Sequence, residues 1–275
     1  MASATEKLAT LEKVLAEFGP IAVALSGGID SMTLAAVAHR TLPGACEMFH
    51  AVSPAVPGEA SERVRAYARK FNWTLNVFDA GEFDDAAYMQ NPLNRCFYCK
   101  THLYGAVRAR TELQIVSGTN TDDLGEYRPG LIAAREHAVR HPFVEAAIDK
   151  ATVRQIAQQV GLAELSDLPA SPCLSSRVET GIAIDSQLLR LIHLTERQVD
   201  RALTPKTVRC RIRAEGVVVE LDDVTLAVLD TVRRARMEAE IAELFRDSGF
   251  TRPVRFAPYR VGSAFLHPIK LHARV

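Results

Sequence analysis

The sequence predicts an α/β protein with two domains: a parallel-sheet domain over residues 1–170 and a small α+β domain over residues 171–275. Two observations lead to this prediction. In the first part of the chain, short apolar runs typical of buried parallel strands alternate with helical segments. After a proline-containing linker at residues 166–172, the pattern changes to two alternating strands and long helices.

The first domain is expected to begin with an amphipathic helix over residues 5–18, since Ser3 and Glu6 form a capping box and Gly19 and Pro20 end the pattern. Strands are expected at 21–25, 47–52, 74–78, 114–117 and 141–145, and helices at 32–39, 59–71 and 149–161. The second domain is expected to hold a helix over 184–203, a hairpin of 207–213 and 217–221, one helix over 226–246 and a strand over 254–259.

Composition excludes several classes of protein. Lys and Arg together number 33, as do Asp and Glu, so no basic excess indicates a nucleic-acid partner. No apolar run reaches the length of a membrane span, and the N-terminus lacks the form of a signal peptide, so a cytoplasmic location is expected. Five unevenly spaced cysteines favour thiols, metal binding or catalysis over a disulfide framework.

The most informative stretch is the loop that follows the first strand. Ser26, Gly27 and Gly28 come directly after the apolar run, and the following helix carries Asp30 and Ser31. Glycines let a backbone approach a phosphate closely, and the N–H groups at a helix start point at the anion. Asp30 would then hold Mg²⁺ at the phosphates. The alternative is a glycine turn that only closes a βα unit.

This loop is neither a Walker A loop nor a dinucleotide fingerprint. It resembles the SGGxDS PP-loop of the ATP pyrophosphatases, which have the adenine nucleotide alpha hydrolase-like fold. The resemblance implies that ATP is cleaved between its α and β phosphates and that AMP passes to a substrate oxygen.

A second polar loop follows the strand at 114–117. Over residues 118–128 it holds Gly118, Asn120, Asp123 and Arg128, together with Asp122. Such a density of polar side chains at the end of a buried strand favours a nucleotide site. There, Asp122 or Asp123 could serve the metal and Arg128 the phosphates.

Two further segments are candidates for the same site. Ser53 begins a loop over residues 53–58 after the second strand, where it could contact adenine. Lys150 and Arg154 lie in the first turns of the helix at 149–161, where basic side chains oppose the helix dipole. They indicate either an anion partner or an exposed basic face.

Three cysteines are candidates for metal binding or catalysis. Cys96 and Cys99 have the spacing that lets two thiolates hold one metal or cluster, although two buried thiols on a helix would show the same pattern. Cys173 is a third ligand or a nucleophile, and Arg177 could lower its pKa or bind phosphate. His102 follows Cys99 by one turn.

In the second domain, Arg209, Arg211 and Arg213 alternate on one face of a predicted strand. The row is either a solvated face or an anion-binding strip, and Glu220, which could face it, favours the strip. The remaining two cysteines, Cys46 and Cys210, are expected at ordinary apolar sites.

Taken together, these motifs resemble nearly end to end the LarE family, the ATP-dependent sacrificial sulfur transferases of nickel-pincer nucleotide biosynthesis. The resemblance runs through SGGIDS, NPLNRCFYCK, GTNTDDLGEYRPG with AARE after it, DKATVRQIA and PCLSSR. It implies an enzyme that adenylylates a carboxylate of a pyridinium dicarboxylate mononucleotide and releases pyrophosphate. Sulfur then attacks the activated carbonyl, which gives a thiocarboxylate and AMP.

The resemblance also implies a sulfur source. In one branch of the family, the cysteine that matches Cys173 gives up its own sulfur and becomes dehydroalanine. In another branch, three cysteines hold a 4Fe-4S cluster whose open iron delivers sulfide. Cys96, Cys99 and Cys173 are all present here, which favours the cluster over sacrifice of Cys173. Zinc held by these three and His102 is a weaker alternative.

Further roles come from the resemblance alone. It assigns Arg209 and Arg211 to the substrate phosphate, Glu220 to the C-terminal half of the site, and a homo-oligomeric state to the chain. The sequence departs from the family on the substrate side: a usual Trp-Asp-Lys-Pro reads Ser166 to Pro169, a usual Pro-Tyr-Gly reads Glu179 to Gly181, and the strand of Glu220 lacks a usual Arg. ATP use is therefore a firmer expectation than substrate identity.

Three other functions remain compatible with the phosphate loop. An ammonia-dependent amide-forming ligase would need a glutaminase domain, for which the chain has no room, and has no use for three cysteines. A tRNA thiolase should carry a basic face, which the neutral net charge disfavours. A non-catalytic sensor would bind the nucleotide without turnover.

Overall fold

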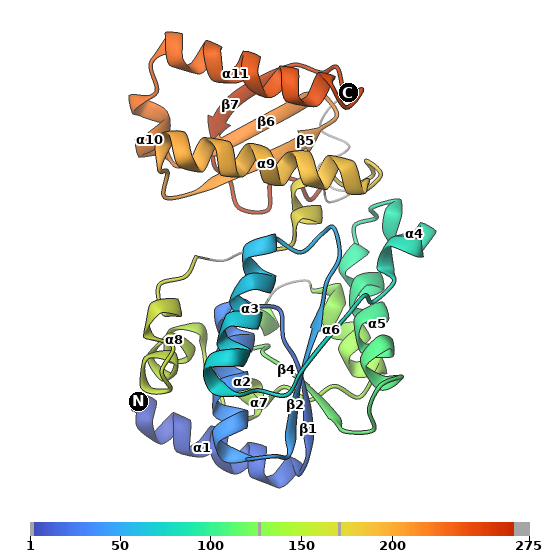
Figure 1. The fold of residues 1–275 in the computed structure, drawn as a ribbon, viewed down its shortest axis with the longest axis vertical. Coiled ribbons are helices and arrows are strands. Elements are labelled where there is room, and N and C mark those ends of the chain that lie inside the picture. The colour runs from blue at the N-terminus through green and yellow to red at the C-terminus, as the bar shows by residue number, and fades with distance from the viewer. Residues whose placement is uncertain (1–2, 126–127, 170–171, 267–275) are drawn as a thin grey trace. The chain divides into compact units, whose positions relative to one another are not determined.

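In the computed structural model, residues 3–125, 128–169 and 172–266 are described, and the chain forms two compact units (Figure 1). The first unit takes the described residues up to 83 and those of 94–169. The second takes residues 84–93 and 172–266. The segment 84–93 is thus an excursion from the first half of the chain into the second unit, which the sequence pattern did not predict.

A parallel sheet of four strands forms the centre of the first unit. Its strands are β1 (Ile21–Ala24), β2 (Cys46–Ala51), β3 (Leu75–Phe78) and β4 (Gln114–Ser117), in the order β3-β2-β1-β4. The chain builds the sheet outward from β1 to β3 and then returns to place β4 on the other side of β1. The carboxyl ends of β1 and β4 therefore flank the switch point at which α/β sheets bind ligands.

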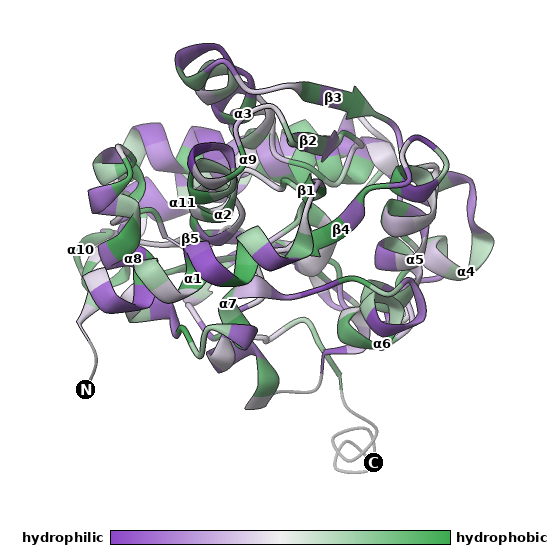
Figure 2. Ribbon diagram, turned by 90° about the horizontal axis from the view of Figure 1, so that it is seen from below, coloured by the Kyte–Doolittle hydropathy of each residue, from purple (hydrophilic) through white to green (hydrophobic). Residues whose placement is uncertain are grey.

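Helices cover both faces of this sheet. They are α1 (Ala4–Phe18), α2 (Ile29–Thr41), α3 (Gly58–Phe71), α5 (Arg95–Arg108), α6 (Pro129–Glu136), α7 (Pro142–Glu145) and α8 (Lys150–Gln159). In Figure 2 the strands are coloured mainly as hydrophobic, whereas the surrounding helices carry both colours. This is the distribution expected when strands are buried on two faces and helices on one.

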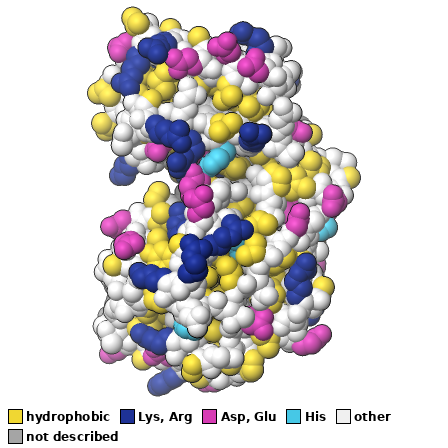
Figure 3. Space-filling model, in the orientation of Figure 1, with side chains coloured by type: hydrophobic (Ala, Val, Ile, Leu, Met, Phe, Trp, Pro, Cys, Tyr) yellow, Lys and Arg dark blue, Asp and Glu magenta, His cyan; other side chains and the backbone are white. Residues whose placement is uncertain are grey.

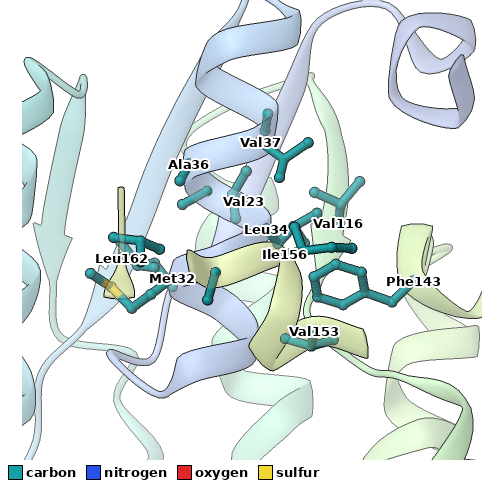
Figure 4. Packing of buried hydrophobic residues seen from close by; sticks show 14 of the residues in the cluster. Val23, Met32, Leu34, Ala36, Val37, Val116, Phe143, Val153, Ile156 and Leu162 are labelled. Carbon is teal, nitrogen blue, oxygen red and sulfur yellow. The ribbon is translucent and has the colours of Figure 1, made fainter. Parts of the chain in front are cut away.

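Alternate residues of β1 point into two separate cores. Ile21 and Val23 join a cluster with α1, α2, α3, α7 and α8, part of which Figure 4 shows around Met32, Phe143 and Ile156. Ala22 and Ala24 face the other cluster, which includes residues of α5 and α6. The predicted capping box at Ser3 is present, and the Asp149 carboxylate caps α8 by accepting from the Thr152 N–H at 2.8 Å.

The second unit combines a small sheet with helices. Strand β5 (Val208–Arg213) pairs antiparallel with β6 (Gly216–Leu221), which pairs in parallel with β7 (Val254–Pro258). Helix α9 (Ser186–Leu203) packs against β5 and α11 (Thr231–Arg246) against β7. The short helices are α4 (Ala86–Met89) and α10 (Asp223–Val228).

Two buried side chains tie the excursion of residues 84–93 to the rest of the second unit. The Tyr88 hydroxyl shares a hydrogen bond of 2.7 Å with the Ser175 hydroxyl. The Asn91 side-chain amide donates to the carbonyl oxygens of Glu179 and Ile182, each at 2.9 Å. Because Tyr88 and Asn91 are almost completely buried, these bonds fix the excursion as part of the unit's interior.

Two of the predicted elements are wrong. Residues 142–145 form helix α7 rather than a strand, because Pro142 at its first position presets a helical φ and supplies no N–H to a ladder. The single long helix predicted over 226–246 is two helices. Leu229 is extended, and the Asp230 carboxylate caps α11 by accepting from the Arg233 N–H at 2.8 Å. Among the residues described, no helix is both long and apolar enough to cross a membrane.

The core position of α7 gives a test. Phe143 is fully buried in the core shared with α1, α2 and α8. Phe143→Ala is expected to lower the free energy of unfolding by about 3–5 kcal/mol, because a cavity remains where the ring was. Chemical denaturation followed by fluorescence of Trp73, the single tryptophan of the chain and a buried residue of the same cluster, measures the change. Ile132→Ala, at a half-exposed position, serves as the control and should cost far less.

Candidate functional site

The loop after β1 is held in a compact turn by its own side chains. The Ser31 hydroxyl accepts from the Ser26 N–H at 3.1 Å and donates to the Gly28 carbonyl at 3.1 Å. The Ser26 and Ser31 hydroxyl oxygens lie 3.0 Å apart. Gly28 stands at the N-cap of α2 and has no capping side chain, so the first N–H groups of this helix present a site for an anion.

Two glycines are required by the close packing around this loop. Gly27 has a φ of +82°, and a Cβ at this position would lie 2.7 Å from the Ala60 carbonyl oxygen of α3. A Cβ at Gly118, which follows β4, would lie 2.8 Å from the backbone nitrogen of Ser31. The loops that leave β1 and β4 are therefore in direct backbone contact, as the switch point of the sheet leads one to expect.

Asp30 is the centre of a polar cluster between these two loops. One of its carboxylate oxygens forms an ion pair with the Lys150 ammonium group of α8. The other accepts from the side-chain amide of Asn120 at 3.2 Å. The Asn120 N–H in turn donates to Asp123 at 3.0 Å, and Asp123 forms an ion pair of 2.9 Å with Arg128. Five residues predicted from separate motifs thus form one connected group.

Asp122 and Arg154 hold the backbone around this cluster. The Asp122 carboxylate accepts from the Lys150 backbone N–H at 3.2 Å and so joins the loop after β4 to the start of α8. The Arg154 guanidinium donates to the carbonyl oxygens of Ser166 and Leu168. Of the two basic residues in α8, only Lys150 reaches the cluster, whereas Arg154 anchors the chain that leaves the first unit. Arg154 is partly buried rather than part of an exposed basic face, and its contact with an anion stays a prediction.

Ser53 begins the loop after β2, where its hydroxyl accepts from the Ala55 N–H at 3.3 Å. Its contact with adenine stays a prediction.

The structure also adds two residues that the sequence analysis missed. The Arg63 guanidinium donates to the Gly27 carbonyl at 2.7 Å, and a ring nitrogen of the buried His50 lies 2.7 Å from the Leu25 carbonyl oxygen. No local sequence signal marks either residue, because each contact joins segments 25 or more positions apart.

The candidate cysteine ligands are divided between the two units. Cys96 and Cys99 lie in the first turns of α5, three residues apart and half-buried, and His102 follows on the same helix. Cys173 belongs to the second unit and is also half-buried. Within the described ranges, no three His, Cys, Asp or Glu side chains are grouped so that they could hold a metal ion. A ligand set of Cys96, Cys99 and Cys173 stays a prediction.

The remaining cysteines differ from these three. Cys46 and Cys210 are buried, as expected. Burial raises the pKa of the Cys46 thiol to about 11, and it raises the pKa of Cys210 further. Both therefore stay protonated at neutral pH and are poor nucleophiles.

In the second unit, Arg177 holds the backbone that carries Cys173. It is almost fully buried and binds both carboxylate oxygens of Glu196, at 3.0 and 3.1 Å. Its guanidinium also donates to the carbonyl oxygens of Pro172 at 2.5 Å and Cys173 at 3.1 Å. A direct effect of Arg177 on the thiol or on a phosphate stays a prediction.

The arginine row on β5 is not a solvated face. Glu220 of β6 is buried and binds Arg211 at 3.1 Å and Arg213 at 3.0 Å. Burial and the nearby Arg177 charge lower the pKa of Arg209, so like charges lie close together in this unit. The assignment of Arg209, Arg211 and Glu220 to the substrate stays a prediction. Figure 3 shows basic side chains gathered in groups, with acidic ones beside them, on the face it presents.

Comparisons with known proteins fit this geometry. A model of the asparagine synthase family matches residues 9–102, which include the loop at 26–31. An uncharacterized protein of Synechocystis sp. is 33% identical over 89% of this chain and 91% of its own length. The pyridinium-3,5-bisthiocarboxylic acid mononucleotide synthase of Lactiplantibacillus plantarum is 27% identical over 81% of this chain and 82% of its own. An uncharacterized protein of Methanocaldococcus jannaschii is also 27% identical, over 84% of this chain and 87% of its own.

Gly118 provides the sharpest test of the site. Gly118→Ala places a methyl group within 3 Å of the Ser31 and Asp30 backbone, so the two loops must separate. We expect overpacking to cost about 1–3 kcal/mol of stability, and binding of Mg·ATP to weaken by at least tenfold, on the order of the loss of one charge-assisted hydrogen bond. Titration calorimetry measures the affinity.

The matched control is Gly125→Ala in the same loop, where an added Cβ would have no neighbour within 4 Å among the described residues. Equal affinities for the two variants would show that the contact between the loops does not shape the site.

Proposed function

This chain belongs to the LarE-like family of PP-loop sulfur transferases, and from that premise we propose that it activates a substrate carboxylate with ATP and then replaces a carboxylate oxygen with sulfur. The observation that carries the proposal is the polar cluster of Asp30, Asn120 and Lys150 beside a glycine loop at the switch point of the sheet. The loop supplies backbone N–H groups that can bind phosphate. Beside them, Asp30 is a carboxylate suited to a metal ion, and Lys150 is a cation that compensates negative charge.

The proposed substrate is a pyridinium dicarboxylate mononucleotide. Support comes from the relative in Lactiplantibacillus plantarum, whose name gives a pyridinium bisthiocarboxylic acid mononucleotide as its product, and from the alignment over four fifths of both chains. Arg209 and Arg211 of β5 are the proposed contacts of the substrate phosphate. A cytoplasmic location and a homo-oligomeric state belong to the same proposal.

In the first step, the N–H groups of the loop and of the start of α2 bind the phosphates of ATP. A substrate carboxylate oxygen attacks the α-phosphorus, the bond from that phosphorus to the bridging oxygen breaks, and pyrophosphate leaves. Lys150 contributes a positive charge beside Asp30. The Asp30 carboxylate fits Mg²⁺, because a magnesium ion bound together with a nucleotide needs only one or two protein carboxylates. A bound Mg²⁺ would neutralise negative charge on the phosphates.

In the second step, a sulfur nucleophile attacks the acyl carbon and AMP leaves with the former carboxylate oxygen. We propose Cys173 as the residue that brings the sulfur. As a sacrificial donor, its thiolate forms a thioester. Loss of the Cα proton and cleavage of the Cβ–S bond then release the thiocarboxylate and leave dehydroalanine. The alternative favoured by the sequence is a 4Fe-4S cluster on Cys96, Cys99 and Cys173, fed by sulfide or another donor, and it stays a prediction.

Cysteine variants separate the two steps. Cys173→Ala is expected to keep ATP-dependent and Mg²⁺-dependent pyrophosphate release, since adenylylation precedes sulfur attack. It should lower thiocarboxylate formation by about a hundredfold or more, because the nucleophile is gone. Cys46→Ala, at a buried thiol, is the control and should keep both reactions. Pyrophosphate release is measured by a coupled assay and the thiocarboxylate by mass spectrometry.

Variants of Cys96 and Cys99 decide the sulfur source. If a cluster is present, anaerobically purified protein contains about four irons per chain, and Cys96→Ala or Cys99→Ala loses both the iron and sulfur transfer. If Cys173 is sacrificed, those two variants complete one turnover and dehydroalanine appears at position 173. Absence of pyrophosphate release with every carboxylate tested would contradict the proposed function and leave a nucleotide-binding protein.

A further inference from the structure

Three carbonyl groups at the phosphate loop, those of Leu25, Gly27 and Gly28, are engaged by protein donors. The Gly28 carbonyl accepts from the Ser31 hydroxyl at 3.1 Å and from the Met32 N–H at 3.0 Å. The carbonyls of Leu25 and Gly27 are bound from outside the loop by His50 of β2 and Arg63 of α3. A carbonyl oxygen repels phosphate. Because these carbonyls are bound by protein donors, the loop presents N–H groups rather than carbonyl oxygens to an anion.

Arg63 controls the direction of one peptide group in particular. In a planar trans peptide, the C=O of Gly27 and the N–H of Gly28 point in opposite directions. A guanidinium that holds the Gly27 oxygen at 2.7 Å therefore aims the Gly28 N–H away from α3. Within the described part of the chain, that N–H makes one long contact, of 3.4 Å, with the Ser26 hydroxyl. Both flanking residues are glycines, so without such a tether the peptide could rotate at little steric cost.

The helix that carries Arg63 is itself fixed against the loop. The Ala60 carbonyl oxygen closes the space beside Gly27, so that no Cβ fits there. The Ser61 hydroxyl lies 2.8 Å from the second ring nitrogen of His50, whose first nitrogen reaches the Leu25 carbonyl. A carbonyl only accepts, so Nδ1 of neutral His50 must carry the proton and Nε2 must accept from Ser61. The first turns of α3 thus contact the loop directly at Gly27 and are linked to the Leu25 carbonyl through His50.

From these contacts we propose that Arg63 is a positioning residue for the terminal phosphates of ATP, because it holds the Gly27–Gly28 peptide with its N–H toward the anion. This inference rests on the proposed role of the loop in binding ATP. It assigns Arg63 no contact with the nucleotide. The residue acts through the loop backbone, and its charge behind the glycines adds to the positive field at the start of α2.

The test compares ligands that differ in their phosphates. Arg63→Gln is expected to weaken binding of Mg·pyrophosphate and Mg·ATP by about ten- to thirtyfold, as expected for a lost hydrogen bond from a charged donor. AMP lacks the β and γ phosphates, so its affinity should change by less than about twofold. Calorimetry on the full chain measures all three ligands, and circular dichroism checks the fold.

Two further variants make the result specific. Arg63→Lys keeps a charged donor and should recover most of the lost pyrophosphate affinity. Arg69→Gln removes the same charge from an exposed position near the end of α3 and should bind as the wild type does. If Arg63→Gln does not fold, Arg63→Lys still tests the inference. It is expected to retain the affinity for AMP and to lose about two- to fivefold in affinity for pyrophosphate, less than the loss expected when the charged donor is removed.

The inference is overturned if Arg63→Gln binds pyrophosphate like the wild type, or if it loses AMP and pyrophosphate affinity equally. A wild-type chain that binds neither Mg·ATP nor Mg·pyrophosphate also overturns it. A wild-type chain that binds both but forms no thiocarboxylate contradicts only the proposed sulfur transfer, and the comparison of variants then still applies.

Discussion

The backbone contact between the loop after β4 and the first turn of α2 is the constraint on which the site depends. Gly118 lies so close to Asp30 and Ser31 that no side chain fits between them. Because of this contact, the carboxylate of Asp30 meets the amide of Asn120, and the loop that continues to Asp122 can reach the start of α8. Lys150 reaches the cluster because it is the first residue of α8.

The two units use charge in different ways. In the first, Asp30 and Lys150 form a partly exposed pair, so both groups remain reachable from solvent. In the second, Glu220 with Arg211, and Glu196 with Arg177, form buried pairs that also bind backbone carbonyls or N–H groups. Removing one partner of such a pair leaves a buried charge, which costs far more than the pair itself contributes.

Local patterns predicted the parts of the molecule that depend on neighbouring residues. The capping box at Ser3, the strand–glycine–helix unit at the phosphate loop and the cap at Asp149 all follow from short stretches of sequence. That Asp30 and Asn120 serve one nucleotide site was also expected, because both follow strands of a parallel sheet. Their hydrogen bond depends on the pairing of β1 with β4, which only the structure shows.

Elements that depend on distant contacts were not predictable in this way. Residues 142–145 carry an apolar run that suits a strand as well as one turn of helix. Pro142 favours the helix, and the packing of Phe143 in the core adds a contact that the run itself does not show. The guanidinium of Arg63 reaches Gly27 across 36 positions, a distance at which no periodicity gives a signal. The carbonyl partners of Arg154 lie in an irregular segment, so its role could not be read from the helix pattern.

The excursion of residues 84–93 has a consequence for how the chain can be divided. Tyr88 and Asn91 complete the interior of the second unit, although they are encoded between β3 and α5 of the first. A fragment cut after the linker would lack both side chains and would leave the carbonyls of Glu179 and Ile182 without these donors. Exchange of the second unit between relatives therefore requires two inserted pieces, and the shorter one runs directly into the helix that carries Cys96 and Cys99.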